Sequence, residues 1–485
     1  MELMLNLEPE AVWKYFYEIT QIPRPSKKEE KVILYLEAFA AKHNLPLKKD
    51  AAGNVLIAKR ATKGYENLPV VILQSHVDMV CEKNSDVTHD FENDPIKTVV
   101  DGEWLRADGT TLGADNGIGM AAELALLAAD DIEHGALECL FTVDEETGLT
   151  GANALEEGFM TGRILLNLDS EDEGELFIGC AGGKGTTATF AYEPQPAPAS
   201  MLYFKIAVSG LKGGHSGCDI HCGRGNANKI LARFLYLLEG KFDFVLSELK
   251  GGNLHNAIAR EAFAVIGVEP SDREAVRVLL NRFAADVENE LKRVDPDVHI
   301  GMETVGKQDF HIGKDLSEKL IFSLLACPHG VAAMSSDVEG LVETSTNLAS
   351  VRMDAGHRIV VCTSQRSSVE SAKNAVADQV AATFRLAGAE VAHGDGYPGW
   401  APNKDSKILA AARDTYRKLF GREPEIKAIH AGLECGLFLK KYPWLDMISF
   451  GPTLREVHSP NERIRIDTVQ LWWNHLLELL KNIPA

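Results

Sequence analysis

The sequence has little positive charge and no long apolar run. It carries 50 basic residues against 70 acidic ones, which gives a net charge of −20. A surface with this excess repels polyanions, so we expect neither nucleic acid nor an anionic membrane among its partners. No apolar run approaches the ~20 residues that a membrane-spanning helix needs. The first ten residues carry acids where a signal peptide needs bases and an apolar stretch, so a cytoplasmic location is expected.

Cysteine is also sparse. The 8 cysteines are scattered through 485 residues, mostly inside apolar segments. Scattered cysteines in a large chain are typical of reduced thiols in a cytoplasmic protein. Cys218 and Cys222 flank His221, but no second cysteine pair follows at the spacing of a zinc site. We therefore expect no metal there.

Short apolar runs alternate with helical patterns in the first part of the chain. The runs at 70–73, 137–143 and 164–168 are unalternating, which indicates strands covered on both faces. Residues 118–129 have strong helical periodicity, and Ser26 with Glu29 predicts a capping box at the start of another helix. The pattern predicts an α/β sandwich, with a mixed sheet flanked by helices.

The order of predicted strands and helices changes after a proline-rich connector at 193–200. Near the end of the chain the pattern is again typical of an α/β fold. We therefore expect a catalytic domain in two parts, at residues 1–187 and 395–485. An α+β domain at residues 188–394 would be inserted between them.

Histidines and carboxylates follow the predicted strands of the catalytic domain. His76, Glu145, Glu146 and Asp169 each lie at the end of an apolar run, and ligands gather at such strand ends in α/β sheets. Asp115 lies in a glycine-flanked turn before a helix, and His458 follows the strand at 447–450. Two imidazoles and several carboxylates are the ligands of a pair of zinc, manganese or cobalt ions. The sequence therefore predicts a two-metal hydrolase.

The chemistry suggests one role for each residue. Asp115 would bridge the ions, with His76 and Asp169 completing one shell and Glu146 and His458 the other. Asp78 would fix the His76 ring, and Glu145 would move a proton from the water to the leaving amine. Each acid alone is more often a helix cap or a solvated side chain, as we take Asp144 to be. Only the combination favours the metal site.

Several long motifs carry a resemblance to a known family. They lie at residues 74–80, 110–120, 145–146, 167–174, 179–183, 210–217 and 430–438. The chain resembles, essentially from end to end, the aminoacyl-histidine (Xaa-His) dipeptidases of the peptidase D type. These belong to the co-catalytic zinc peptidases related to carboxypeptidase G and carnosinase.

The resemblance implies two zinc ions, a lid formed by the inserted domain, and the same ligands and base as above. It further implies that His215 polarises the scissile carbonyl and stabilises the oxyanion. Asn256 and Arg366 would contact the substrate, with Arg366 gripping its carboxylate. The loop from Gly432 to Glu434 would line the substrate pocket. Whether the protein is a homodimer stays open, and so does whether His215 acts in its own subunit or across the dimer.

The expected activity is hydrolysis of dipeptides, chiefly carnosine-like or other Xaa-His substrates. One alternative is a broader di- or tripeptidase, and another is a deacylase of N-acyl amino acids, because all share this metal core. A metal-bearing protein without catalysis is a third reading. Glu145 argues against it, since a binding protein has no use for a proton shuttle.

Overall fold

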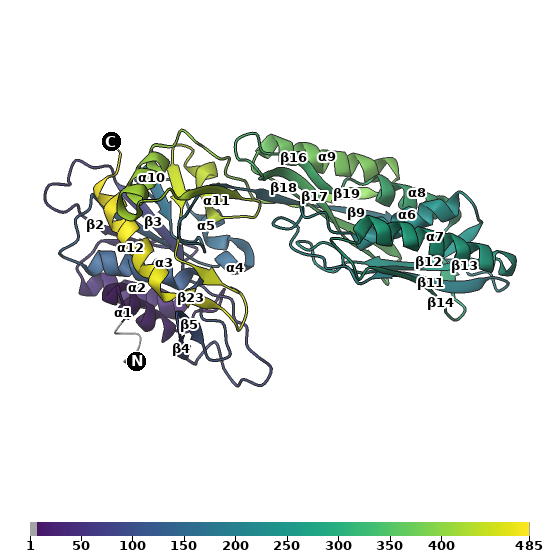
Figure 1. Ribbon diagram of the computed structural model, residues 1–485, viewed down its shortest axis with the longest axis horizontal. Helices are drawn as coiled ribbons and strands as arrows, with labels where there is room; N and C mark the ends of the chain where they lie inside the picture. The colour runs from purple at the N-terminus through teal and green to yellow at the C-terminus, as the bar shows by residue number, and fades with distance from the viewer. Residues whose placement is uncertain (1–6, 485) are drawn as a thin grey trace. The chain divides into compact units, whose positions relative to one another are not determined.

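The computed structural model describes residues 7–484 and divides into two compact units. The first unit comprises Met1–Gly179, Trp400–Ala428 and Leu433–Ala485, and the second comprises Cys180–Gly399 and Ile429–Gly432. The chain thus leaves the first unit, builds the second and returns (Figure 1). Whether the second unit acts as a lid, with the boundaries expected above, stays a proposal.

An eight-stranded mixed sheet forms the centre of the first unit. Its strands run in the order β1-β2-β6-β3-β7-β21-β8-β20. Their bounds are β1 Leu47–Lys49, β2 Val55–Lys59, β6 Leu137–Thr142, β3 Val71–His76, β7 Ile164–Asn167, β21 Asp446–Ser449, β8 Glu175–Cys180 and β20 Glu425–Ile429. The central strands β6, β3, β7 and β21 are parallel, so their carboxyl ends share one edge. Every residue of β3, β6 and β7 is buried, as their unalternating sequences predict.

Helices pack around this sheet. They are α1 Glu10–Thr20, α2 Glu30–Lys42, α3 Ala114–Ala128, α4 Glu145–Gly148, α5 Thr150–Ala154, α10 Lys407–Phe420, α11 Glu434–Lys441 and α12 Ile466–Lys481. Nearly all of α3 is buried because it packs between β3 and α1. A four-stranded sheet completes the unit, in the order β22 (Leu454–Arg455), β23 (Arg463–Arg465), β5 (Trp104–Ala107) and β4 (Thr98–Asp101).

The capping box predicted at Ser26 is wrong. Helix α2 begins at Glu30 without a side-chain cap. The Ser26 hydroxyl instead donates to Asp78 Oδ2 over 2.8 Å, and Glu29 Oε1 accepts the backbone N–H of Lys27 over 2.8 Å. The Ser26 hydroxyl therefore binds the buried carboxylate of Asp78 and not the backbone at the start of α2.

A nine-stranded sheet forms the second unit, with helices along one face (Figure 1). Its order is β14-β11-β13-β12-β17-β18-β9-β19, with β16 paired to β17. The strands are β14 His299–Thr304, β11 Leu202–Ser209, β13 Ala262–Val268, β12 Phe244–Gly251, β17 Val342–Met353, β18 Arg358–Ser367, β9 Gly182–Ala191, β19 Glu390–His393 and β16 Gly330–Met334. The helices are α6 Ala227–Glu239, α7 Arg273–Leu291, α8 Lys314–Ala326 and α9 Glu370–Leu386, with a short 3-10 helix η2 at Pro270–Asp272. A separate pair, β10 Gln195–Pro196 and β15 Phe310–His311, lies outside this sheet.

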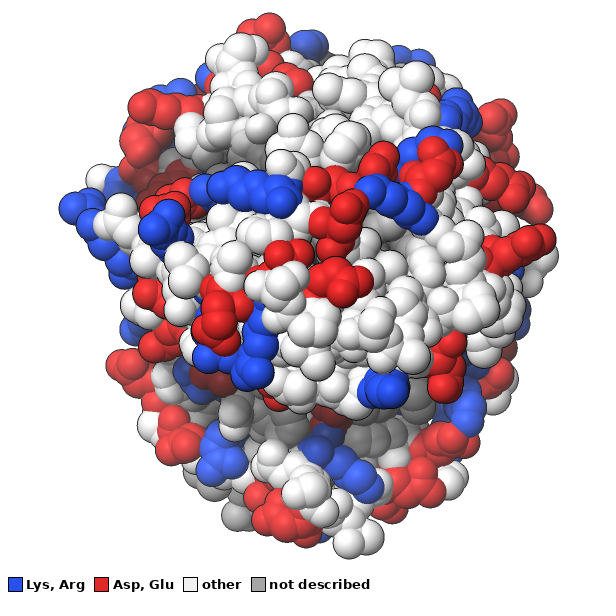
Figure 2. Space-filling view, turned by 90° about the vertical axis from the view of Figure 1, so that its right-hand side faces the viewer, with Lys and Arg blue, Asp and Glu red and all other residues white. Residues whose placement is uncertain are grey.

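Charges of both signs are interspersed on the face seen in Figure 2, where basic side chains gather into no single patch. Between residues 7 and 484, none of the helices combines the length and apolar character needed to cross a membrane. The 8 cysteines, all within the described residues, form no disulfide; Cys218 and Cys222 are exposed.

Candidate metal centre

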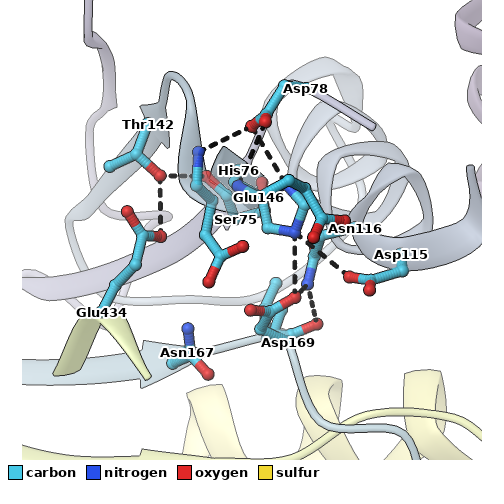
Figure 3. Close-up of polar contacts among 12 residues, drawn as sticks. Ser75, His76, Asp78, Asp115, Asn116, Thr142, Glu146, Asn167, Asp169 and Glu434 are labelled. Carbon is cyan, nitrogen blue, oxygen red and sulfur yellow. Dashed lines mark hydrogen bonds and ion pairs between the residues drawn. The ribbon is translucent and has the colours of Figure 1, made fainter. Parts of the chain in front are cut away.

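The predicted ligands of the first unit converge on one edge of the sheet. In the parallel register His76 lies opposite Thr142 and Gln74 opposite Asn167, so the residues that follow emerge together. His76 ends β3, Glu145 and Glu146 begin α4 just beyond β6, and Asp169 lies two residues beyond β7. Figure 3 shows the side chains of His76, Asp115 and Asp169 pointing toward one another.

His76, Asp115 and Asp169 form one cluster. The His76 Nε2 atom lies 3.1 Å from Asp115 Oδ1 and 3.4 Å from Asp169 Oδ1. One ligand atom from each residue falls within 4.8 Å of the others, close enough to surround one ion. These are the three residues that the sequence analysis assigns to one ion, and their role as ligands stays a prediction.

Asp115, Glu146 and His458 form a second cluster. The His458 Nε2 atom lies 3.1 Å from Asp115 Oδ2 and 3.0 Å from Glu146 Oε2. Asp115 therefore offers one oxygen to each cluster, as a bridging carboxylate must. The other Glu146 oxygen, Oε1, is buried without a hydrogen-bond partner among the described residues. An unpaired buried carboxylate oxygen is costly, and a cation would remove that cost.

The electrostatics of the two clusters suit cations. Hydrogen bonds to Asp115 and Glu146 raise the pKa of His458 to about 11. Burial raises the pKa of Asp169 to about 6. Burial acts in the same direction on Asp115, but hydrogen bonds from His458 and His76 hold its pKa below the usual range. Each imidazole is thus held beside carboxylates where a positive charge is favourable, and the residues present fit a pair of divalent ions.

Asp78 connects His76 with the two glutamates. Its Oδ1 lies 3.3 Å from His76 Nδ1 and accepts the backbone N–H of Glu145 over 3.0 Å. Its Oδ2 accepts the backbone N–H of Glu146 over 3.2 Å. Burial works against its ionisation, but the contacts with His76 hold the pKa of Asp78 at about 2. One carboxylate therefore orients the imidazole and the start of α4 together.

Glu145 lies beside both clusters without belonging to the bridge. It groups with His76 and Glu146 within the same 4.8 Å limit. Burial raises the pKa of Glu145 well above its ordinary value. A desolvated carboxyl group next to the ligands, with no side-chain hydrogen bond to a described residue, is placed as a proton acceptor would be.

Two residues that hold this edge together were not predicted from the sequence. The carboxylate of Glu462 accepts the backbone N–H groups of residues 112–115 over 2.7–3.3 Å, which fixes the turn carrying Asp115. The buried guanidinium of Arg24 donates to Val77 O over 2.9 Å, to Asp78 O over 2.7 Å and to Gly113 O. Both act on backbone atoms far away in sequence, so no local pattern reveals them.

Glu434 lies in the interior of the first unit. Its Oε2 accepts from Gln74 Nε2 over 2.6 Å and from Thr142 Oγ1 over 2.8 Å, as Figure 3 shows for Thr142. The Gln74 Oε1 atom accepts in turn from Asn167 Nδ2 over 2.5 Å, and Asn167 accepts from Ser449. These bonds join β3, β6, β7 and β21 beneath the ligands. The proposed pocket role of Glu434 stays a prediction, since its side chain is buried and bonded to the strands.

Glu171 follows Asp169 by two residues, in the segment between β7 and β8. Burial of its carboxyl group, followed by the charges of Asp115 and Asp169, raises the pKa of Glu171 to about 8. The residue as a whole is exposed. No pattern in the sequence assigned it a role.

The second unit gathers its own polar cluster around Arg366, at the end of β18. Arg366 Nη1 donates to Tyr397 Oη over 3.0 Å, and Nη2 lies 3.3 Å from His215 Nε2. His215 Nδ1 accepts the backbone N–H groups of Gly217 and Cys218 over 3.3 and 3.1 Å. Burial and then the Arg366 charge lower the pKa of His215. Arg366 and His215, both singled out from the sequence, are therefore neighbours.

Tyr397 was missed because its place is defined by two glycines distant in sequence. A Cβ atom on Gly183 or Gly432 would lie 2.7 or 2.8 Å from the Tyr397 ring, so only glycine leaves room for it. Asn256 lies close to His215: its carbonyl accepts the N–H of Ser216 over 2.8 Å, and His215 pairs with Ala257.

Comparison with known proteins gives consistent matches. Residues 72–482 match the model of peptidase family M20/M25/M40. The chain is 43% identical to the cytosol non-specific dipeptidase of Escherichia coli strain K12 over 485 residues, which is 100% of both chains. It is 45% identical to the aminoacylhistidine dipeptidase of Vibrio alginolyticus, whose crystal structure matches with a TM-score of 0.92 over 99% of this chain and 98% of that one. A tripeptidase of Staphylococcus aureus shares the fold at 17% identity, with a TM-score of 0.58 over 98% and 99%. The predicted α/β fold, with a mixed sheet flanked by helices, is confirmed.

Proposed function

This chain belongs to peptidase family M20/M25/M40, and from that premise we propose that it is a dipeptidase that works with a pair of divalent metal ions. The observation that carries the proposal is Asp115, whose two oxygens reach His76 in one cluster and His458 in the other. Two relatives that are 43% and 45% identical to this chain, and that match along nearly their full length, are named dipeptidases.

The ligands proposed are His76, Asp115, Glu146, Asp169 and His458. Zinc suits their mixture of imidazole and carboxylate, and manganese or cobalt would also fit. When bound, such ions act as Lewis acids on a carbonyl and make water acidic enough to attack near neutral pH. Asp78 holds His76 in the orientation that presents Nε2 to the ligand cluster.

Glu145 acts as the general base. It accepts a proton from the attacking water and returns it to the amine that leaves. Its backbone N–H is tied to Asp78, so the side chain starts from a fixed point beside the ligands.

The second unit supplies substrate contacts. Arg366 binds the carboxylate of the dipeptide, and His215 donates to the carbonyl oxygen as negative charge develops on it. The two backbone donors on His215 Nδ1 leave Nε2 as the protonated atom of the neutral ring. Asn256 lies beside His215 as a further contact. Residues 188–394 would form the lid, and 1–187 with 395–485 the catalytic domain.

Dipeptides ending in histidine are the preferred substrates in this proposal, because the Vibrio relative is named for them. The Escherichia coli relative is named non-specific, which favours broad dipeptide hydrolysis as the second candidate. Its name also supports the cytosol as the location. The proposal includes assembly of two copies of this chain into a homodimer.

A substrate panel tests the activity. We expect the metal-loaded protein to hydrolyse Xaa-His dipeptides with a higher kcat/KM than other dipeptides. Tripeptides and N-acetyl amino acids should be poor substrates. Equal rates on all dipeptides would support the second candidate. Preference for N-acetyl amino acids would make the protein a deacylase, and no hydrolysis of any dipeptide would overturn the proposal.

A further inference from the structure

Arg366 is a buried cation without a partner anion. The residue is 8% exposed, and among residues 7–484 no Asp or Glu side chain forms an ion pair with it. Its Nη1 atom donates to the Tyr397 hydroxyl over 3.0 Å, and Nη2 lies 3.3 Å from the His215 ring. Its Nε atom has no hydrogen-bond partner among the described residues. A buried charge with only these partners favours the binding of an anion, which in the proposed function is the carboxylate of the dipeptide.

The register of the second unit's sheet brings Tyr397 onto the same face as Arg366. Arg366 on β18 lies opposite Gly183 on β9, and Gly183 forms a further antiparallel bridge with Tyr397. This bridge has both backbone hydrogen bonds, from Tyr397 N to Gly183 O over 2.8 Å and from Gly183 N to Tyr397 O over 3.0 Å. Directly opposed residues of antiparallel strands present their side chains on one face. Tyr397 and Arg366 therefore share a face, with a glycine between them.

Two glycines confine the tyrosine ring. A Cβ atom on Gly183 would lie 2.7 Å from Tyr397 Cε1, and one on Gly432 would lie 2.8 Å from Tyr397 Cε2. These two carbons are on opposite edges of the ring, so the ring is held from both sides. Because Gly183 has no side chain, the ring can extend across β9 to the guanidinium of Arg366. The sheet thus fixes the position of the Tyr397 hydroxyl.

A phenol suits this position better than a carboxylate would. An Asp or Glu beside Arg366 would form an ion pair with it, and the carboxylate of the substrate would then have to displace that partner. The phenol oxygen accepts a hydrogen bond from Nη1 and carries no charge. It therefore restricts the rotation of the guanidinium and leaves the positive charge available to the substrate.

We propose that Tyr397 is a positioning residue, which fixes the guanidinium of Arg366 and thereby increases the preference of the protein for dipeptides with a free carboxylate. The inference rests on the proposed function, in which Arg366 binds that carboxylate, and adds the residue that orients Arg366. A hydrogen bond to a charged group corresponds to roughly 10- to 100-fold in affinity. Because Tyr397 acts through Arg366, we expect an effect at the lower end of this range.

The test measures kcat/KM on alanyl-histidine and on its carboxyl-amide, for the wild type and Tyr397→Phe. Phenylalanine keeps the ring between the two glycines and removes the hydroxyl. The wild type should prefer the free dipeptide. Tyr397→Phe should lose roughly 10-fold in kcat/KM on the free dipeptide, mainly through KM, and little on the amide. Tyr203→Phe is the matched control, because it removes a hydroxyl that donates to Pro198 O in the same unit, and should keep the wild-type preference.

A double-mutant cycle distinguishes positioning from support of the fold. In an Arg366→Ala background there is no guanidinium to orient. Adding Tyr397→Phe to that background should therefore change kcat/KM on the free dipeptide by less than about 2-fold. A residue that only supports the fold would lower kcat/KM by the same factor in both backgrounds.

An unchanged preference in Tyr397→Phe, an equal loss on both substrates, or an equal loss in both backgrounds would overturn the inference and leave the dipeptidase proposal intact. If the wild type hydrolyses the free dipeptide and its amide equally well, the carboxylate role of Arg366 fails, and the inference fails with it. Absence of dipeptide hydrolysis by the wild type would instead refute the proposed function.

Discussion

Glu145 and Glu146 are adjacent in sequence but are assigned different roles, and exchanging each for glutamine separates these roles. Glutamine keeps the size and shape of the side chain while removing its charge and its ability to accept a proton. Both residues keep their backbone hydrogen bonds to Asp78, so neither exchange should disturb the start of α4.

The structure sets the expected size of each effect. The Glu145 side chain makes no hydrogen bond to a described residue, so Glu145→Gln should leave folding and both ions intact. General base catalysis contributes ~10²–10⁴-fold, so turnover should fall by at least this factor, or about 3–5 kcal/mol in the barrier. Glu146 Oε2 lies 3.0 Å from His458 Nε2 and Oε1 is buried without a partner among the described residues. An amide there replaces an anionic ligand, so one ion should bind at least ~10–100-fold more weakly, the loss typical even of outer partners.

The assay measures metal content and kcat in the same preparations of the wild type and both variants. Glu145→Gln should retain two ions per chain with low kcat, and Glu146→Gln should lose one ion at limiting metal. If Glu145→Gln loses metal while Glu146→Gln keeps it, the two assignments are reversed. If neither exchange lowers turnover, the reasoning about this site is refuted.

Four other predictions concern positions farther from the bridge. Arg366→Ala should lower kcat/KM roughly 10- to 100-fold on free dipeptides but little on their carboxyl-amidated forms; equal losses would make Arg366 structural. Asp78→Ala should weaken metal binding ~10–100-fold, measured by competition with a chelator, and unchanged affinity would contradict its orienting role. Gln74→Leu leaves buried partners unpaired and should cost ~1–3 kcal/mol in urea unfolding, whereas unchanged stability would show that the network relaxes. Burial lowers the pKa of His475 to about 4 in the folded state. Below about pH 6.5 the unfolded state therefore binds a proton at His475 that the folded state does not bind until about pH 4. Stability should therefore fall as the pH drops from about 6.5 to 4, and His475→Gln should lose part of that dependence between neutral pH and about pH 5; an unchanged dependence would exclude His475 as its source.

The sequence predicts where a residue lies when its position follows from the strand or helix that carries it. His76 and Asp169 could be placed because unalternating apolar runs indicate buried strands, and ligands follow the carboxyl ends of such strands. Because parallel strands share one edge, residues more than ninety positions apart could be expected to meet, and the structure brings them within 3.4 Å.

The sequence cannot indicate contacts that depend on the tertiary arrangement alone. Glu462 and Arg24 bind backbone atoms of distant turns, and Tyr397 occupies a space that two remote glycines leave open. The capping box at Ser26 was wrong for the same reason: Asp78, 52 residues away, takes the hydroxyl that the local pattern assigns to a helix. Local patterns therefore locate the candidate ligands but not the residues that position them.

The most direct test of the central claim is to follow metal content and dipeptide hydrolysis together during removal and restoration of metal. We predict two ions per chain in the active protein, loss of turnover as a chelator removes them, and recovery when zinc, manganese or cobalt is added back. Full turnover in protein that elemental analysis finds free of metal would contradict the account.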